Sequence, residues 1–312
     1  MKYIELTYPH QIKKDTAAEQ VAAIGFFDGI HKGHQAVIQQ ALAIAKEENK
    51  KCAVISFHPH PSVILKGTKE EVRYITTIEE KRAILEEMGV DYLYVITFNE
   101  ALSKLSPQAF IDHFIVGLHI THLVAGFDYT FGHKGAGNME NIDEMANGRF
   151  ATTVVDKLAQ DNEKISSTRI RKLLREGAVK DVAHLLGRVY ETTGTVVHGD
   201  NRGGSKLGFP TANLEVPKDK FLPKQGVYAV KVHYQDETFH GMANLGVVPT
   251  FTDGRSEPKL EVNIFDFDQS IYGERLTVEW HRFVREERKF ASIEDIVQQL
   301  KQDEEVIRNF FA

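Results

Sequence analysis

The sequence predicts two domains: a doubly wound α/β domain with a parallel sheet at residues 1–185, and a small antiparallel β-barrel with a C-terminal helix at residues 186–312. A chain of 312 residues favours two domains over one. Up to about residue 185, short β-branched runs alternate with longer helical stretches, which is typical of parallel strands joined by crossover helices. After about residue 187, closely spaced strand-like runs separated by Gly, Pro and Asn favour a small barrel.

Apolar, β-branched runs define the strands expected in the first domain. They are VAAIGF at 21–26, KCAVISF at 51–57, DYLYVITF at 91–98, ITHLVAG at 120–126 and ATTVVDKL at 151–158. Helices are expected to begin near His34, Ile78, Pro107 and Ser167. Ser106 before Pro107 is typical of an N-cap followed by proline at the first helical position. This alternation predicts a parallel sheet with crossover helices.

The second domain is expected to contain strands and one helix. Its clearest strand-like runs are VYETTGTVVHG at 189–199, GVYAVKVHY at 226–234, TFHGMANLG at 238–246, KLEVNIFDF at 259–267 and RLTVEWHRFV at 275–284. Residues 292–311 carry apolar side chains at helical spacing behind Ser292, a good N-cap. We therefore expect a C-terminal helix that packs against the barrel.

The composition argues against several classes of protein. The single cysteine, Cys52, rules out an internal disulfide and fits a reducing cytosol. No charged-then-apolar leader opens the sequence, and no apolar run approaches the ~20 residues of a membrane span. A net charge of -6 argues against broad binding to nucleic-acid backbone but allows a local basic site for a phosphorylated ligand. We expect a cytoplasmic protein with small-molecule substrates and no nucleic-acid or membrane partner; its oligomeric state stays open.

The stretch GFFDGIHKGH at 25–34, just after the apolar run VAAI at 21–24, is the first candidate site. Open α/β sheets bind ligands at the carboxyl ends of their strands. The helix expected after Gly33 offers free N–H groups and a positive dipole end, which suit a phosphate. The spacing of His31 and His34 lets both imidazoles face one pocket and stabilise charge during displacement at phosphorus. By itself, H-x-G-H also fits a capped surface turn.

The stretch ISSTRIR at 165–171 is the second candidate site. Its hydroxyl residues, Ser166, Ser167 and Thr168, can cap free amides or contact a phosphate, and Arg169 supplies a planar cation. Taken alone, this stretch also fits an ordinary capped helix. The pair of turns resembles the nucleotidylyltransferase superfamily, in which an H-x-G-H turn and a Ser-Thr-rich turn hold ATP while an acceptor attacks the α-phosphate.

The string LGFPTANLEVP at 207–217 is the most specific in the chain. Thr211 and Asn213 present oxygen atoms that suit Mg²⁺ beside ATP phosphates, although GFPTAN alone also fits a structural β-turn. Further matching pieces are GVYAV at 226–230, NLGVVPTF at 244–251 and LEVNIFDFDQSIYGE at 260–274. With these pieces and the two turns, the chain resembles the bacterial bifunctional riboflavin kinase and FMN adenylyltransferase family, the FAD synthetases, over essentially its full length.

For the first domain, the resemblance implies a Rossmann-like nucleotidylyltransferase that makes FAD. The residues it implies at ATP are Gly25, Phe26, Asp28, Gly33, Ser166, Ser167, Thr168 and Arg169, with His31 and His34 as catalytic groups at the phosphates. The segments FHPHP at 57–61 and GFDYTFG at 126–132 are implied on the flavin side. The flavin-binding residues are then Phe57, Pro59, Asp128 and Phe131. The same segments also fit a strand ending in a proline turn and a set of core aromatic residues.

For the barrel, the resemblance implies a riboflavin kinase. It places Gly208 and Thr211 at ATP, Thr211 and Asn213 at Mg²⁺, and Glu261 as the base for the ribityl hydroxyl. A primary alcohol is a poor nucleophile at neutral pH, so a carboxylate that accepts its proton would assist attack on the γ-phosphate.

Strand alternation sets Glu261 and Asn263 on one face of KLEVNIFDF. The opposite face carries Leu260, Val262 and Ile264. Alternation leaves open whether the face of Glu261 meets solvent or a pocket.

The expected function is two-step FAD biosynthesis: ATP phosphorylates riboflavin to FMN, then a second ATP adenylylates FMN to FAD with release of pyrophosphate. One alternative keeps only the FMN adenylyltransferase, with a kinase-inactive C-terminal module. Another is a flavin-sensing regulator without turnover, which no DNA-reading motif supports. Ser205 and Val248 stand where many family members have a basic residue, and this departure bears on kinase activity.

Overall fold

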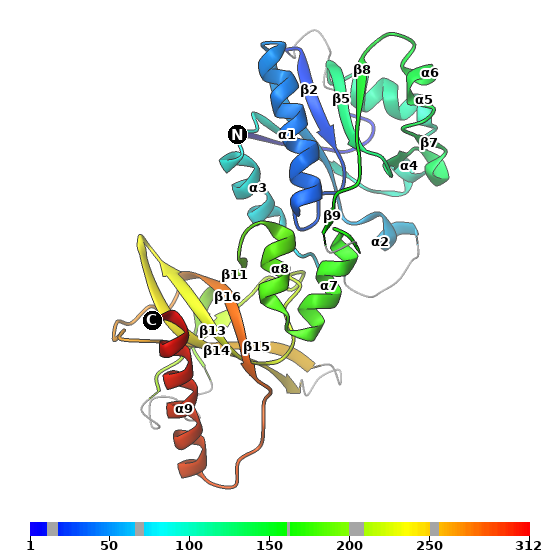
Figure 1. Ribbon diagram of the computed structural model, residues 1–312. Coiled ribbons are helices and arrows are strands. Elements are labelled where there is room, and N and C mark those ends of the chain that lie inside the picture. Colours follow the sequence, from blue (N-terminus) through cyan, green and yellow to red (C-terminus); the bar gives the residue numbers. More distant parts are fainter. Residues whose placement is uncertain (11–17, 66–71, 161–162, 200–208, 250–255) are drawn as a thin grey trace. The chain divides into compact units, whose positions relative to one another are not determined.

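The computed structural model describes residues 1–10, 18–65, 72–160, 163–199, 209–249 and 256–312. Contacts between residues divide the chain into two compact units, Met1–Ser167 and Thr168–Ala312. Figure 1 shows a sheet with helices in the first and a strand-rich barrel in the second.

A six-stranded parallel sheet in the order β1-β4-β3-β2-β5-β8 forms the centre of the first unit (Figure 1). Its strands are β1 (Lys2–Leu6), β2 (Gln20–Ile24), β3 (Lys51–His58), β4 (Tyr92–Thr97), β5 (Ile120–Gly126) and β8 (Ala151–Val155). All the strands predicted for this domain are confirmed. The edge strand β1 is an addition: its sequence KYIEL mixes charged and apolar residues and lacks the continuous apolar run of a central strand.

Helices and short hairpins connect the strands of this sheet. The longer helices are α1 (Lys32–Glu47), α3 (Ile78–Glu87) and the pair α5 (Pro107–Phe110) and η2 (Ile111–Val116). The shorter elements are α2 (Pro61–Leu65), α4 (Glu100–Ser103), β6 (Thr130–Phe131), η3 (His133–Gly135), β7 (Gly137–Asn138), α6 (Ile142–Ala146), β9 (Ala159–Gln160) and β10 (Glu163–Lys164). The predicted cap at Ser106 is confirmed, since its hydroxyl accepts a hydrogen bond from the Ala109 amide.

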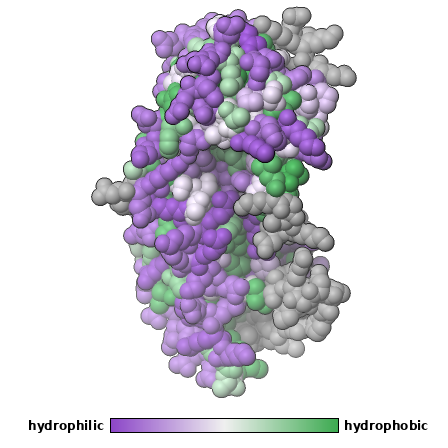
Figure 2. Space-filling model, turned by 90° about the vertical axis from the view of Figure 1, so that its right-hand side faces the viewer, coloured by the Kyte–Doolittle hydropathy of each residue, from purple (hydrophilic) through white to green (hydrophobic). Residues whose placement is uncertain are grey.

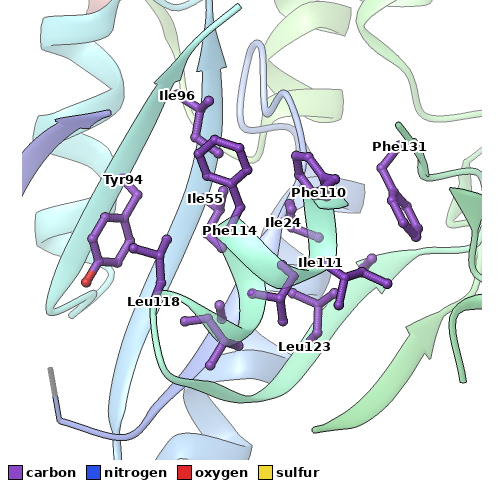
Figure 3. Packing of buried hydrophobic residues seen from close by; sticks show 14 of the residues in the cluster. Ile24, Ile55, Tyr94, Ile96, Phe110, Ile111, Phe114, Leu118, Leu123 and Phe131 are labelled. Carbon is purple, nitrogen blue, oxygen red and sulfur yellow. The ribbon is translucent and has the colours of Figure 1, made fainter. Parts of the chain in front are cut away.

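Both faces of the sheet are buried, as expected of a doubly wound domain. On one face, Val21 and Ala23 pack with Val37 and Ile38 of α1 and Leu85 of α3. The other face packs against α5 and η2. Figure 3 shows Phe110, Ile111 and Phe114 from that segment, and Leu118 just after it, beside the sheet residues Ile24, Ile55, Ile96 and Leu123. These two cores fix the strand ends that carry the first candidate site.

The second unit contains a closed antiparallel barrel in the order β11-β12-β15-β14-β13-β16. Its strands are β11 (Tyr190–Val197), β12 (Ala212–Glu215), β13 (Gly226–Tyr234), β14 (Glu237–Pro249), β15 (Ser256–Ile264) and β16 (Arg275–Arg285). The predicted barrel is therefore confirmed. Strand β12 was not predicted as a strand, because its short sequence ANLE lies within the turn-rich string at 207–217.

Three helices accompany the barrel: α7 (Ser167–Glu176), α8 (Val179–Leu186) and α9 (Ile293–Phe311). The helix predicted from Ser167 begins there, and Ser292 caps α9 by accepting from the Asp295 amide at 3.1 Å. Helix α8 contacts β11 and β16, and α9 contacts β14. Contacts thus group α8, and all of α7 except Ser167, with the barrel, and the predicted boundary after residue 185 stays a prediction.

Hydrophilic residues predominate on the face drawn in Figure 2, where hydrophobic residues form small scattered groups. Within the described ranges, no helix has both the length and the apolar character needed to cross a membrane.

Candidate active sites

The turn between β2 and α1 has an unusual backbone. Phe27 and Ile30 adopt positive φ angles of 51° and 40°, and Gly29 one of 90°. Positive φ is uncommon for residues other than glycine and persists where the surroundings enforce it. Phe27 and Ile30 are fully buried, which holds the turn in place, and a Cβ at Gly25 would meet the Phe27 ring at 2.9 Å. Tight packing thus determines the path of this turn.

Both histidines of the H-x-G-H turn lie at the start of α1. His31 is the N-cap, and its Nδ1 accepts a hydrogen bond from the His34 amide at 3.2 Å. The two rings stack with centroids 3.6 Å apart. The helix therefore begins at Lys32, two residues before the predicted start, because an imidazole serves as its cap. A Cβ at Gly33 would lie 3.2 Å from the His31 ring, so glycine there permits the close approach.

His34 is held in its neutral form. Burial lowers its pKa well below the ordinary value, and the charges of His31, Lys81 and Lys164 lower it further. Its Nδ1 is buried and has no hydrogen-bond partner among the described residues. A neutral imidazole has one N–H donor and one acceptor nitrogen, so a free ring atom here is available to a ligand.

Asp28 joins the opening turn to its neighbours. Its side chain is buried and accepts from the Thr76 amide at 3.1 Å, while its backbone carbonyl accepts from the Ser167 hydroxyl at 2.8 Å. The first and second candidate turns are thus in direct contact through Ser167. Ser166 is half-buried beside it. Thr168 and Arg169 belong to the second unit, and their role at ATP stays a prediction.

The structure gives the four predicted flavin residues different environments. Phe57 and Phe131 belong to the hydrophobic core, where Phe110 lies between their rings at 6.3 and 5.6 Å. Asp128 is exposed and forms a short ion pair with Lys164. Pro59 is half-buried, and the next residue, His60, packs edge-on against Phe26 at 4.5 Å. The role of these four residues at flavin stays a prediction.

Two further polar groups at this site were not predicted from the sequence. The Lys81 ammonium is buried and donates to the Phe26 carbonyl at 2.8 Å and to Ser56 Oγ at 2.9 Å. The Tyr129 hydroxyl is buried with no partner among the described residues. In the sequence, the lysine of IEEKRAILEE resembles an ordinary solvated helix residue, and the tyrosine is one aromatic among several in GFDYTFG.

A row of polar side chains crosses the barrel wall on three neighbouring strands. Asn213 of β12 pairs with Glu261 of β15, and Glu261 pairs with Asn244 of β14. Residues directly opposite each other in a ladder share a face, so these side chains lie in one row. Asn244 Nδ2 donates to Glu287 Oε1 at 3.2 Å, which adds a second carboxylate at its end. Asn244 and Glu287 were not predicted as site residues.

Asn213 has the property expected of a metal ligand. Its Oδ1 is buried and has no hydrogen-bond partner among the described residues. A Cβ at Gly199 would lie 2.3 Å from Asn213 Nδ2, so the amide is packed against backbone. A buried carbonyl oxygen without a donor suits a hard cation. Thr211 is exposed just before β12, and the predicted ATP contact Gly208, like Ser205, lies outside the described residues.

Glu261 occupies the predicted face of β15. Its side chain is 31% exposed and forms an ion pair with Lys259 at 2.8 Å. The opposite face is the barrel interior, where the predicted set Leu260, Val262 and Ile264 is buried. Asn263, on the face of Glu261, is also buried, because its amide donates to the Pro210 carbonyl at 2.7 Å and thereby holds the GFPTAN turn. The side chain of Val248 is not among those described.

Comparisons with known proteins identify both parts of the chain. Two family models match it, FAD synthetase over residues 13–169 and riboflavin kinase over residues 186–311. The bifunctional riboflavin kinase/FMN adenylyltransferase of Listeria monocytogenes is 47% identical over 312 residues, which cover 100% of this chain and 99% of the relative. That of Bacillus subtilis is 44% identical over 312 residues, covering 99% and 98%.

A solved structure gives the same fold over the full length. It comes from Streptococcus pneumoniae, is described as a macrolide-efflux protein, and has a TM-score of 0.89 and 35% identity with coverage of 99% of both chains. Its description differs from both family matches, and its similarity supports the two-part architecture.

The H-x-G-H turn on a parallel sheet and the GFPTAN string on a closed barrel define the class: an FAD synthetase domain followed by a riboflavin kinase domain. The chain belongs to the family of bifunctional riboflavin kinases/FMN adenylyltransferases. The resemblance predicted from the motifs is therefore confirmed.

Proposed function

We propose that the two activities of this family, which use ATP and produce FMN and FAD, are divided between the two units of this chain. The barrel phosphorylates riboflavin to FMN with release of ADP. The α/β unit joins FMN to the adenylyl group of a second ATP and releases pyrophosphate. The observation that carries this proposal is that each unit has, at its predicted site, a buried polar atom with no hydrogen-bond partner in the described part of the chain: His34 Nδ1 in one and Asn213 Oδ1 in the other.

In the α/β unit, the phosphate of FMN attacks the α-phosphorus of ATP, and the bond to the β-phosphate breaks. His31 and His34 hold the phosphate oxygens where negative charge gathers, and the N-terminus of α1 adds its free amides. The lowered pKa of His34 keeps that ring neutral, so it acts as a hydrogen-bonding group and not as a fixed cation. Gly25, Phe26, Asp28 and Gly33 shape the turn that receives ATP.

In the barrel, Glu261 takes the proton of the riboflavin ribityl hydroxyl as that oxygen attacks the γ-phosphorus of ATP. Its ion pair with Lys259 keeps the carboxylate oriented before substrate arrives. The amide of Asn263 holds the Pro210 carbonyl, which fixes the turn leading to Thr211.

Mg²⁺ fits the donor set at the start of β12. Thr211 and Asn213 would hold the ion with neutral oxygen atoms, and the ATP phosphates would complete its coordination. When bound, the ion neutralises charge on the phosphates. We retain a cytoplasmic location as a prediction from composition.

Product analysis tests the proposed function. Purified protein is incubated with riboflavin, ATP and Mg²⁺, and riboflavin, FMN and FAD are separated over time. The proposal expects FMN first and then FAD. FAD formed only from added FMN would support the kinase-inactive alternative, and flavin binding without any product would support the sensor.

A further inference from the structure

Lys81 occupies a position that is unfavourable for a cation. It lies in the first turn of α3 behind the cap Thr77, where the positive end of the helix dipole opposes a positive charge. Its side chain is only 4% exposed. Burial lowers its pKa from 10.5 to about 8, although the charge of the buried Asp28 carboxylate acts in the opposite direction. A methionine of similar length would fill this space without the cost of a buried charge.

The ammonium group makes its contacts with the opening turn and the adjacent strand. Lys81 Nζ donates to the Phe26 carbonyl at 2.8 Å and to Ser56 Oγ at 2.9 Å, and the Ser56 hydroxyl itself donates to the same carbonyl at 3.0 Å. The Nζ also lies 5.1 Å from the centroid of the Phe26 ring. One carbonyl of the phosphate-binding turn is therefore held by two donors.

Holding that carbonyl fixes the direction of a whole peptide unit. A trans peptide is planar, so the Phe27 N–H points opposite to the Phe26 carbonyl, away from Lys81. Phe27 is the first residue of the turn with a positive φ angle. Release of the carbonyl would allow this peptide to rotate toward a more common conformation and displace the residues that follow it.

The charge of Lys81 also reaches the groups that follow in the turn. The Asp28 carboxylate is attracted to the Lys81 ammonium group. The same ammonium group disfavours the protonated form of His34 and lowers its pKa. The beginning of α3 is tied to the same turn, because the Thr76 amide donates to Asp28 Oδ1. The segment that enters α3 thus supplies the Thr76 amide, and α3 itself supplies the Lys81 ammonium group, to the inner side of the phosphate-binding turn.

We propose that Lys81 is a positioning residue for adenylyl transfer: it fixes the Phe26–Phe27 peptide of the ATP-binding turn and places a positive charge beneath the phosphates. This inference rests on the proposed function of the α/β unit. A merely structural lysine would be replaceable by an apolar side chain without loss of turnover.

The test compares Lys81→Met and Lys81→Gln with the unmodified full-length protein. The Met variant removes charge and donor, and the Gln variant keeps a donor without charge. Lys46→Met, at an exposed lysine in the last turn of α1, is the matched control. Each protein is assayed for FAD formation from FMN, for FMN formation from riboflavin, and for thermal unfolding by circular dichroism.

We expect Lys81→Met to lower kcat for FAD formation by ~10²-fold, as for displaced reacting groups, with the KM for FMN within about threefold. Its melting temperature should stay within about 3 °C of the unmodified protein, because the lost contacts offset the relieved burial of charge. FMN formation and the Lys46→Met control should be unchanged. Lys81→Gln should lower kcat for FAD formation by ~10-fold, because the Phe26 carbonyl keeps a hydrogen-bond donor but the positive charge is lost.

Turnover within threefold of the unmodified protein in a folded Met or Gln variant would overturn the inference, and so would unfolding of both variants, which would make Lys81 a structural residue. If the Met variant alone unfolds, the folded Gln variant decides. Absence of FAD formation in the unmodified protein would instead contradict the proposed function.

Discussion

His34 and Asn213 each present a buried polar atom that has no partner among the described residues. A buried donor or acceptor left unsatisfied costs about 1–3 kcal/mol, so such atoms persist where a ligand completes them. The sequence predicted both residues from motif resemblance. It could not reveal that their polar atoms are buried, because burial depends on how distant strands and turns pack around them.

The histidine pair gives the first prediction at this scale. Replacement of His31 or His34 by Ala should lower FAD formation by ~10²-fold or more, because each ring stabilises charge at the α-phosphate. His31→Ala should also destabilise the α/β unit by about 1 kcal/mol, since the His34 amide loses its cap. FMN formation from riboflavin, measured in the same samples, should be nearly intact. A parallel loss of both activities would point to misfolding and remove this role.

Glu261 gives the second prediction. Glu261→Gln keeps the size of the side chain but cannot accept the hydroxyl proton, so riboflavin phosphorylation should fall by ~10²- to 10⁴-fold. The decisive measurement is single-turnover conversion of riboflavin to FMN at saturating ATP and Mg²⁺. Glu215→Gln, at an exposed position on β12, is the matched control. A rate within about threefold of the unmodified protein would return Glu261 to the role of a surface carboxylate.

Asn213→Ala separates metal binding from base catalysis. Loss of the Oδ1 ligand should raise the Mg²⁺ and ATP concentrations needed for half-maximal kinase rate by ~10-fold or more, besides lowering turnover. In Glu261→Gln, those concentrations should change little. Equal Mg²⁺ dependence of Asn213→Ala and the unmodified protein would contradict the ligand role.

At the scale of elements, hydrophobic pattern determined which parts of the fold were predictable. Strands β2, β3, β4 and β5 are largely buried, so their apolar runs are strong signals, whereas the edge strand β8 was predicted from its β-branched residues although none of them is buried. Strands β1 and β12 were not predicted. The hydrophobic signal is weak in β1 because it lies at the edge of the sheet, and in β12 because its short sequence lies among turn-forming residues. Helix α1 begins at Lys32, near the predicted start at His34, and its N-cap is a histidine, which is uncommon in that role.

Strands β13 and β16 carry a carboxylate held between two imidazoles, which predicts a pH dependence. Glu279 contacts His281 at 2.9 Å and His233 at 2.8 Å, and these hydrogen bonds lower its pKa from 4.5 to about 2. Because the folded pKa is depressed, the stabilisation is present above pH 4.5 and is lost as pH falls toward 2. Partial exposure screens the interaction, so we expect about 1 kcal/mol.

Glu279→Gln tests this pH dependence. The difference in unfolding free energy between the variant and the unmodified protein should shrink as the pH falls below 4.5, since other carboxylates contribute equally to both proteins. Glu237→Gln, at an exposed site on β14, should show no such difference. A difference in unfolding free energy that does not change with pH would mean that packing, and not the charge of Glu279, stabilises the unmodified protein.

At the scale of the whole molecule, the single tryptophan offers a selective probe. Trp280 is fully buried in the barrel wall and donates to the Thr192 hydroxyl at 3.0 Å. Tryptophan fluorescence therefore reports unfolding of the second unit alone, while circular dichroism reports both units. This separation allows the stability of each unit to be followed in the full-length protein.

The boundary between the units is where sequence and contacts differ. The change along the sequence from alternating strands and helices to closely spaced strands predicts a domain boundary after residue 185, and the riboflavin kinase match begins at residue 186. Contacts place the division after Ser167 and so group α7 and α8 with the barrel. The sequence pattern divides the chain by the type of element and the contacts divide it by packing, so the boundary after residue 185 stays a prediction.

Two fragments distinguish these boundaries. A fragment of residues 168–312 should fold and phosphorylate riboflavin without making FAD, since it keeps the compact second unit. A fragment of residues 186–312 loses the buried side chains Val179, Val182 and Leu185 of α8, which contacts β11 and β16, and should be less stable by several kcal/mol. Urea unfolding followed by Trp280 fluorescence measures both, with FMN formation as the second readout. If the two fragments have equal urea midpoints of unfolding and equal kinase rates, α7 and α8 are dispensable to the barrel. The domain boundary would then lie after residue 185, as the sequence predicts.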